Sequence, residues 1–123
     1  MKPILTPNAP LALGHYEQAI VHQGLVFVSG QLPLTLSGDI PEGIEAQTEQ
    51  TLENLKAILK EAGSDLNHVL KTTLFITDID LWSQANQVYA SVFGSHKPAR
   101  SAVPVKTLPK GALIEIEAIA ALI

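Results

Sequence analysis

The sequence predicts an α+β fold in which one β-sheet carries two helices on a single face. Two segments have apolar residues at helical spacing, and five strand-like segments surround them in the order ββαβαββ. A chain of 123 residues is long enough for one core, so we expect a single domain over residues 1–123. With both helices on one face, no element remains for the other face, and a second subunit is its expected cover.

The first two strands are expected to form a hairpin. Proline recurs in the first ten residues, which are therefore predicted to be a loop. Residues 16–22 are predicted to form the first strand, and Gln23-Gly24 supplies a turn before a β-branched and aromatic strand over residues 25–29. Glycine and proline recur between residues 30 and 43, which indicates a loop that could line a cleft.

Two helices follow, separated by a strand over residues 68–77. The first is predicted over residues 44–62, with Gly63 as its C-terminal cap. The second is predicted over residues 81–93, with Asp80 as its N-terminal cap and Gly94 at its end. Apolar residues recur at helical spacing in both segments, so each helix has one face for the core.

The last two strands, over residues 100–105 and 113–122, carry charges within apolar sequence. Side chains alternate along a strand, so Glu115 and Glu117 share one face and lie about 7 Å apart. Both glutamates could be solvated charges on an open sheet face, although Leu113 and Ile119 on that face are poor choices for a fully wet surface.

Arg100 also has two interpretations. It could be a surface charge or a member of a structural salt bridge, or its planar fork could bind a substrate carboxylate through two hydrogen bonds. A buried charge without a partner costs several kcal/mol, so charges placed in apolar strands are usually paired or reserved for a ligand. The spacing of these residues does not decide between the two interpretations.

Composition excludes several classes of function. The net charge is −4 and the eight Lys and Arg residues are scattered, whereas a protein that grips a phosphate backbone has a clustered basic face. No cysteine is present and the four histidines are far apart, so we expect no disulfide and no metal site. The N-terminus lacks an apolar signal region and no run reaches membrane-spanning length, so a cytoplasmic protein is expected.

Several short motifs, spread over nearly the whole chain, resemble the Rid family of YjgF/RidA-like reactive-intermediate deaminases. Three of them are the most specific: Pro98-Ala99-Arg100-Ser101, Leu108-Pro109-Lys110-Gly111 and Ile114-Glu115-Ile116-Glu117-Ala118. Further matches are Gly14-His15-Tyr16, Val28-Ser29-Gly30-Gln31, Lys71-Thr72-Thr73, and Asn86 with Tyr89 and Phe93.

The resemblance implies a chorismate-mutase-like fold that assembles as a homotrimer. The sheets would form a central barrel, the helices would lie outside, and the clefts would lie between subunits. It also implies an activity, the hydrolysis of enamine and imine intermediates, such as 2-iminobutanoate and 2-iminopropanoate, to 2-oxo acids and ammonia. No cofactor is implied. This chemistry is plausible without a metal or covalent nucleophile, because a protonated imine is already electrophilic and the site need mainly orient it and deliver water.

The resemblance also implies roles for single residues. Arg100 would hold the substrate carboxylate, Glu115 would activate the attacking water, and Tyr16 would place its hydroxyl near the imine or the water. Glu117 would be structural. The other substrate-binding positions implied are Ser29, Gly30, Asn86 and Ala102, the last acting through its backbone.

Two positions depart from the family pattern. His15 stands where many active members have proline, and Ala102 stands where they have cysteine. The first change relaxes the backbone before Tyr16, and the second removes a thiol. Neither removes Arg100 or Glu115, so the activity is expected to be retained with an altered rate or substrate preference.

Two competing functions remain open. The same intersubunit cleft could bind a 2-oxo acid without turnover, as a small-molecule-binding or regulatory protein. RNA cleavage is ascribed to some family members, but the acidic charge and the scattered basic residues argue against nucleic acid as a partner.

Overall fold

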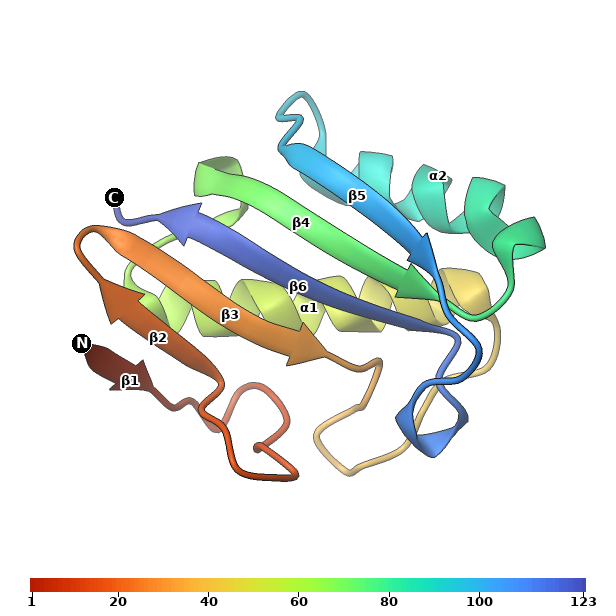
Figure 1. The fold of residues 1–123 in the computed structure, drawn as a ribbon, viewed down its shortest axis with the longest axis horizontal. Coiled ribbons are helices and arrows are strands. Elements are labelled where there is room, and N and C mark those ends of the chain that lie inside the picture. Colours follow the sequence, from red (N-terminus) through yellow and green to blue (C-terminus); the bar gives the residue numbers. More distant parts are fainter.

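The computed structural model describes residues 1–123 and contains one six-stranded sheet with both helices on the same face (Figure 1). The predicted α+β class and the single-faced placement of the helices are therefore confirmed. The strands are β1 Lys2–Ile4, β2 Ala19–His22, β3 Leu25–Gln31, β4 Val69–Ile76, β5 Ala99–Pro104 and β6 Ile114–Ala121. The helices are α1 Ile44–Ala62 and α2 Trp82–Phe93, with short 3-10 turns at Leu66–His68, Ile79–Leu81 and Pro109–Gly111.

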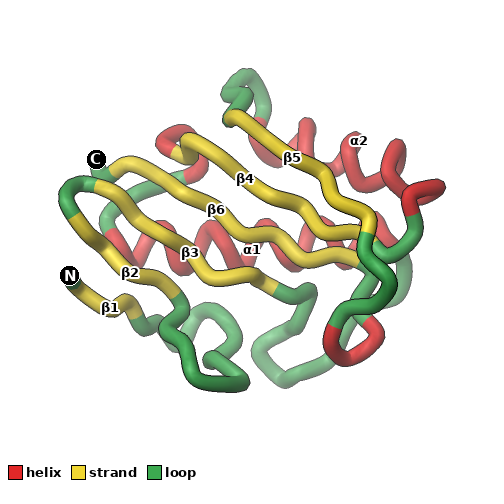
Figure 2. Tube along the Cα trace, viewed as in Figure 1, coloured by secondary structure: helices red, strands yellow, loops and turns green.

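The strand order across the sheet is β1-β2-β3-β6-β4-β5. All neighbouring strands are antiparallel except β4 and β5, which are parallel because α2 connects them on one side of the sheet. The last strand along the chain, β6, thus lies near the middle of the sheet, and β5 forms an edge (Figure 2).

The N-terminal segment differs from the prediction in two ways. Residues 2–4 form an edge strand against β2 rather than a loop, because the Pro3 position pairs with Ile20 at the edge of the sheet, where a missing N–H is tolerated. The predicted strand over 16–22 begins only at Ala19, and Tyr16 lies in a bend before it.

The predicted cap of the second helix is also wrong. The Asp78 side chain, not that of Asp80, accepts a hydrogen bond, from the Asp80 backbone N–H at 3.0 Å, and it caps the short 3-10 turn before α2. Helix α2 itself begins after Leu81 without a side-chain cap. The C-terminal cap of α1 is confirmed, since Gly63 adopts a left-handed conformation with φ of 90°.

Alternation along β6 divides the molecule into a helix face and an open face. Ile114, Ile116, Ala118 and Ala120 are buried against the helices, where they meet Leu52, Leu55, Ile58 and Leu59 of α1. The opposite face of the sheet carries a mixture of apolar and charged side chains with no element over it (Figure 1). Its side chains include Phe27 of β3, Glu115, Glu117 and Ile119 of β6, and Lys71, Thr73 and Phe75 of β4.

We expect the Leu55→Ala variant to lose about 2–5 kcal/mol of unfolding free energy, because Leu55 is fully buried and its removal leaves a cavity. Denaturant unfolding at one fixed protein concentration measures the loss. The control is Leu36→Ala, which removes a side chain that is 65% exposed and should change stability by less than about 0.5 kcal/mol. Equal losses for the two variants would contradict the assigned core.

Candidate active site

Arg100, the only arginine of the chain, lies on the edge strand β5 and turns toward helix α2. It aligns in the parallel ladder with Thr72, whose side chain is buried on the helix face, so both side chains point to that face. Its Nη1 donates a hydrogen bond of 2.8 Å to Asn86 Oδ1. The Arg100 guanidinium carbon lies 4.8 Å from the ring centre of Trp82 and 4.9 Å from that of Tyr89.

These contacts hold the guanidinium without neutralising it. The single ion pair of the structure joins Asp65 and His68, so the salt-bridge interpretation of Arg100 does not apply within one chain. Two aromatic faces stabilise the charge through cation–π contact, while most of the guanidinium N–H groups stay available. The arrangement suits a carboxylate ligand that meets the exposed side of the fork.

The Tyr89 ring lies under the Arg100 guanidinium and is fixed by a buried hydrogen bond. Its hydroxyl shares a hydrogen bond of 2.7 Å with the Thr72 hydroxyl, and both side chains are buried. Burial raises the pKa of Tyr89, so the phenol stays neutral. A hollow of about 410 Å³ lies beside the Tyr89 ring. It is lined by residues of α2, the following loop and β5, among them Asn86, His96, Lys97 and Arg100.

Glu115 lies on the open face of β6, beside a bulge in β3. The ladder pairs Val28 with Ala118 and Gln31 with Ile116, so Ser29 and Gly30 are the irregular part of β3. A Cβ atom at Gly30 would lie 2.9 Å from the Glu115 Cδ and Oε1 atoms, which is closer than side chains approach. The absence of a side chain at Gly30 therefore makes room for the Glu115 carboxylate.

The environment of Glu115 differs from that of Glu117. The Glu117 side chain is exposed, whereas Glu115 is half-buried and accepts no hydrogen bond from the chain. Burial, and secondly the charge of Glu117, raise the pKa of Glu115 above its usual range. The solvated-charge interpretation thus fits Glu117, while Glu115 has the properties of a group that exchanges protons.

Tyr16 lies in the loop before β2, and its hydroxyl is bonded within that loop. The backbone N–H of Leu13 donates to the Tyr16 hydroxyl at 3.2 Å. Because this oxygen accepts from the backbone, its own proton is free to point outward to a ligand. Tyr16 and Gly30 line the same small hollow, of about 20 Å³.

Ser29 and Gln18 fix the path of that loop. The Ser29 hydroxyl donates to the Glu17 carbonyl at 2.6 Å, so its proton is already used within the chain. The buried Gln18 side chain bonds the Thr6 N–H at 2.7 Å and the Pro10 carbonyl at 2.9 Å. The sequence analysis missed Gln18 and Trp82, because a glutamine in a predicted strand and a tryptophan on an amphipathic helix carry no signal of these contacts.

The candidate residues form two groups on opposite faces of the sheet. Arg100 and Ala102 align with the buried Thr72 and Leu74 and share the helix face with Asn86 of α2. Glu115 lies on the open face against Gly30, and β4 lies between β6 and β5. Tyr16 shares only a small hollow with Gly30. One chain therefore does not bring the cation and the carboxylate together.

The family follows from comparison with known proteins. The family model described as endoribonuclease L-PSP matches residues 6–122. The chain belongs to this YjgF/RidA family. A 2-iminobutanoate/2-iminopropanoate deaminase of Escherichia coli is 42% identical, over 97% of this chain and 96% of that protein. A candidate regulator of Lactococcus lactis, AldR, is 51% identical over 98% of this chain and 97% of its own.

Solved structures of YjgF/RidA proteins share the fold. Escherichia coli TdcF, crystallised with bound serine, superimposes with a TM-score of 0.95 at 42% identity, covering 98% of each chain. Within the present chain, no group of three or more His, Cys, Asp or Glu side chains is placed to hold a metal ion. Neither helix has the length and apolar character needed to cross a membrane.

We expect Tyr89→Phe to lower the unfolding free energy by about 1–3 kcal/mol, because the buried Thr72 hydroxyl is left without its partner. Adding Thr72→Val should recover part of that loss, since both polar groups are then gone. A double-mutant cycle from chemical unfolding measures the coupling. Additive losses from the two substitutions would show that this hydrogen bond is not formed.

Proposed function

We propose that the protein hydrolyses 2-imino acids, such as 2-iminobutanoate and 2-iminopropanoate, to 2-oxo acids and ammonia. The observation that carries the proposal is the pair of complementary groups, an arginine fork without a carboxylate partner and a half-buried glutamate with a raised pKa. A relative with 42% identity is named for this activity. Together these groups match the two needs of the reaction, a carboxylate clamp and a proton acceptor for water.

We also propose that each active site lies between two copies of the chain in a homotrimer. Arg100 and Glu115 lie on opposite faces of one sheet, so a substrate that touches both needs Arg100 from one copy and Glu115 from the next. The open face, with Phe27 42% exposed, supplies an apolar surface for this association. Its cover by neighbouring copies would account for the apolar side chains around Glu117.

The first chemical step is the attack of water on the imine carbon. Arg100 binds the substrate carboxylate through two N–H groups and thereby orients the C=N bond. Glu115 accepts a proton from water as the oxygen bonds to the carbon of the protonated imine, and the electron pair of the C=N bond moves to nitrogen, which leaves a neutral carbinolamine. The Tyr16 hydroxyl, whose oxygen accepts from the Leu13 N–H, donates a hydrogen bond to the oxygen of this carbinolamine and keeps its proton.

The second step releases ammonia. Glu115 returns its proton to the carbinolamine nitrogen, the C–N bond breaks with its electron pair staying on nitrogen, and an electron pair of the oxygen forms the C=O bond as the hydroxyl proton passes to the Glu115 carboxylate. The products are a 2-oxo acid and ammonia, and Glu115 is ionised again when its proton passes to ammonia or solvent, so atoms and charges balance without a cofactor. A raised pKa suits this shuttle, since a group that titrates nearer neutrality both accepts and returns protons more readily.

Arg100→Ala should raise KM for the imine roughly 10- to 150-fold, because a hydrogen-bonded charge pair contributes about 1.5–3 kcal/mol. A threonine dehydratase generates 2-aminocrotonate in the assay, and the appearance of 2-oxobutanoate is followed. Arg100→Lys should recover only part of the loss, since lysine lacks the planar fork. Lys106→Ala, an exposed cation outside the site, is the control. A parental rate for Arg100→Ala would refute the clamp.

Glu115→Gln should lower kcat about 100-fold or more, whereas Glu117→Gln, two residues along the same face, should keep most of the activity. The base must be ionised, so the parental rate should fall as pH drops through the raised pKa of Glu115. Removal of the Glu117 charge lowers that pKa, and the acidic limb of the pH–rate profile should move to lower pH. An unmoved limb would show that another group titrates.

Mixed trimers test the shared site directly. Arg100→Ala and Glu115→Gln chains, each expected to have little activity alone at an imine concentration below the parental KM, are unfolded together and refolded in equal amounts. If every site takes Arg100 from one copy and Glu115 from the next, about one quarter of the sites regain both residues, so about a quarter of the parental activity should return. Light scattering confirms the trimer. No recovery in refolded trimers would place both residues in the same subunit's site.

The competing functions predict different results in the same assays. One relative, AldR of Lactococcus lactis, is named as a regulator. For the present chain the alternative is a regulator that binds a 2-oxo acid in the same cleft, and binding of 2-oxobutanoate without faster imine decay would support it. The family description names an endoribonuclease, but the chain has a net charge of −4 and no basic cluster. RNA cleavage that persists in a nuclease-free preparation and is lost in Arg100→Ala would revive that function.

A further inference from the structure

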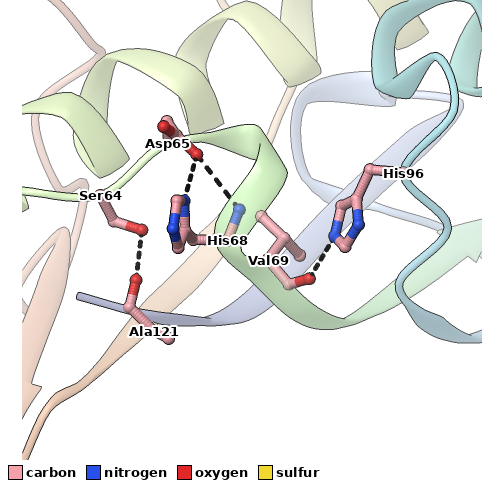
Figure 3. A network of polar contacts seen from close by, with 6 residues as sticks. All are labelled: Ser64, Asp65, His68, Val69, His96 and Ala121. Atoms are coloured by element: carbon pink, nitrogen blue, oxygen red, sulfur yellow. Dashed lines mark hydrogen bonds and ion pairs between the residues drawn. The ribbon is translucent and has the colours of Figure 1, made fainter. Parts of the chain in front are cut away.

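The loop that connects α2 to β5 carries a side chain that the proposed mechanism does not use. His96 lies four residues before Arg100, and both line the hollow of about 410 Å³ beside α2. The His96 Nε2 atom lies 2.7 Å from the backbone oxygen of Val69, at the start of β4 (Figure 3). Its ring also packs near Phe93 at the end of α2, with 6.4 Å between ring centres.

The chemistry of this contact fixes the direction of the hydrogen bond. A carbonyl oxygen only accepts, so the His96 Nε2 must carry the proton and donate it. The bond can therefore form both with the neutral Nε2–H tautomer and with the imidazolium, since both carry a proton on Nε2. This contact acts as a structural tie and needs no change of charge.

The position of the His96–Val69 hydrogen bond in the sheet indicates which segments it joins. The β4–β5 ladder begins with Lys71 opposite Ala99, and at Val69, two residues earlier, β5 has not yet begun. The His96 imidazole thus extends the attachment of this segment to β4 by one further hydrogen bond. Because β5 is an edge strand with every residue exposed, β4 is its only neighbour in the sheet.

We propose that His96 is a positioning residue, which sets the start and register of β5 and thereby holds Arg100 over Trp82 and Tyr89. The catalytic consequence rests on the proposed function, since Arg100 matters for turnover only if it binds the imine carboxylate. The placement of Arg100 itself is independent of that function and can be measured separately.

Trp82 provides this separate measurement. It is the only tryptophan of the chain, and the Arg100 guanidinium lies 4.8 Å from its ring centre. Its fluorescence therefore reports whether the cation stays in place, and Arg100→Ala defines the signal of an empty position. The substitutions to compare are His96→Met, which keeps the bulk beside Phe93 but cannot donate, and His96→Gln, whose amide N–H can replace Nε2–H.

A second histidine at the same end of the sheet supplies the matched control. His68 Nδ1 lies 2.7 Å from Asp65 Oδ1, in the turn before β4 (Figure 3). This hydrogen bond lowers the pKa of Asp65. His68 does not line the hollow beside Arg100. His68→Met removes a histidine hydrogen bond of equal length, so it controls for general loosening at this end of the sheet.

We expect His96→Met to shift Trp82 fluorescence toward the Arg100→Ala signal and to weaken 2-oxobutanoate binding about 3- to 10-fold, the range for one lost hydrogen bond. KM for the imine should rise by a similar factor while kcat stays within about twofold, because Glu115 is untouched. His96→Gln should restore the fluorescence and the affinity, and His68→Met should leave both unchanged.

The proposal is overturned if His96→Met keeps the parental fluorescence, or if His96→Gln behaves like His96→Met. Thermal melts and light scattering verify that each variant is folded and has the parental oligomeric state. If His96→Met does not fold, His96→Asn replaces it, since its shorter amide cannot reach Val69. A fluorescence shift in His96→Met, without any imine hydrolysis by the parental protein, would support the positioning role of His96 and refute the proposed deaminase function. The failure of one proposal can therefore be told from the failure of the other.

Discussion

The alternation of side chains across the sheet is the constraint on which the rest of this structure depends. Because successive residues of a strand point to opposite faces, the helices can cover only one set, and the other set is left on an open surface. In β6 the covered set is wholly apolar, and the open set contains Glu115 and Glu117. The same alternation in β5 turns Arg100 toward the helices.

This division separates two kinds of chemistry that a single substrate would need together. The helix side offers a cation held over two aromatic rings of α2, and the open side offers a carboxylate whose charged form is disfavoured by burial. In the homotrimer that we propose, their separation within one chain gives assembly a functional reason beyond the cover of apolar surface. A site formed between two copies would be inactive in a lone chain and would become complete on association.

The two groups of candidate site residues, around Arg100 and around Glu115, are held in place by different contacts. Arg100 depends on side chains from α2, and the Tyr89–Thr72 hydrogen bond links that helix to β4. Glu115 depends on the backbone, because the β3 bulge brings Gly30 against it and no larger residue would fit. Tyr16 depends on the loop before β2, which is held by hydrogen bonds from the Gln18 and Ser29 side chains to backbone carbonyls of that loop. Polar side chains thus position Arg100 and the Tyr16 loop, whereas the backbone of the β3 bulge makes room for Glu115.

Much of this arrangement could be predicted from local sequence. Helix α1 has the predicted bounds, and the burial of alternate β6 residues follows the apolar pattern of that segment. Both depend on periodicity, which the neighbouring residues determine. The assignment of Asp80 as the cap of the second helix failed because a 3-10 turn, capped by Asp78, precedes α2 and contains Asp80. Helix α2 then begins at Trp82 without a side-chain cap.

The sequence by itself determined both helices, five of the six strands in outline, the apolar face of each helix, and the identity of the charged residues. Only the tertiary structure decided which face Arg100 takes, that Pro3 joins the sheet edge, and that His96 bonds to Val69, 27 residues away. The physical reason is the range of the interactions. Periodicity and capping act within a few residues, whereas strand order, register and side-chain contacts join segments far apart in the chain, and no local pattern encodes which segments meet.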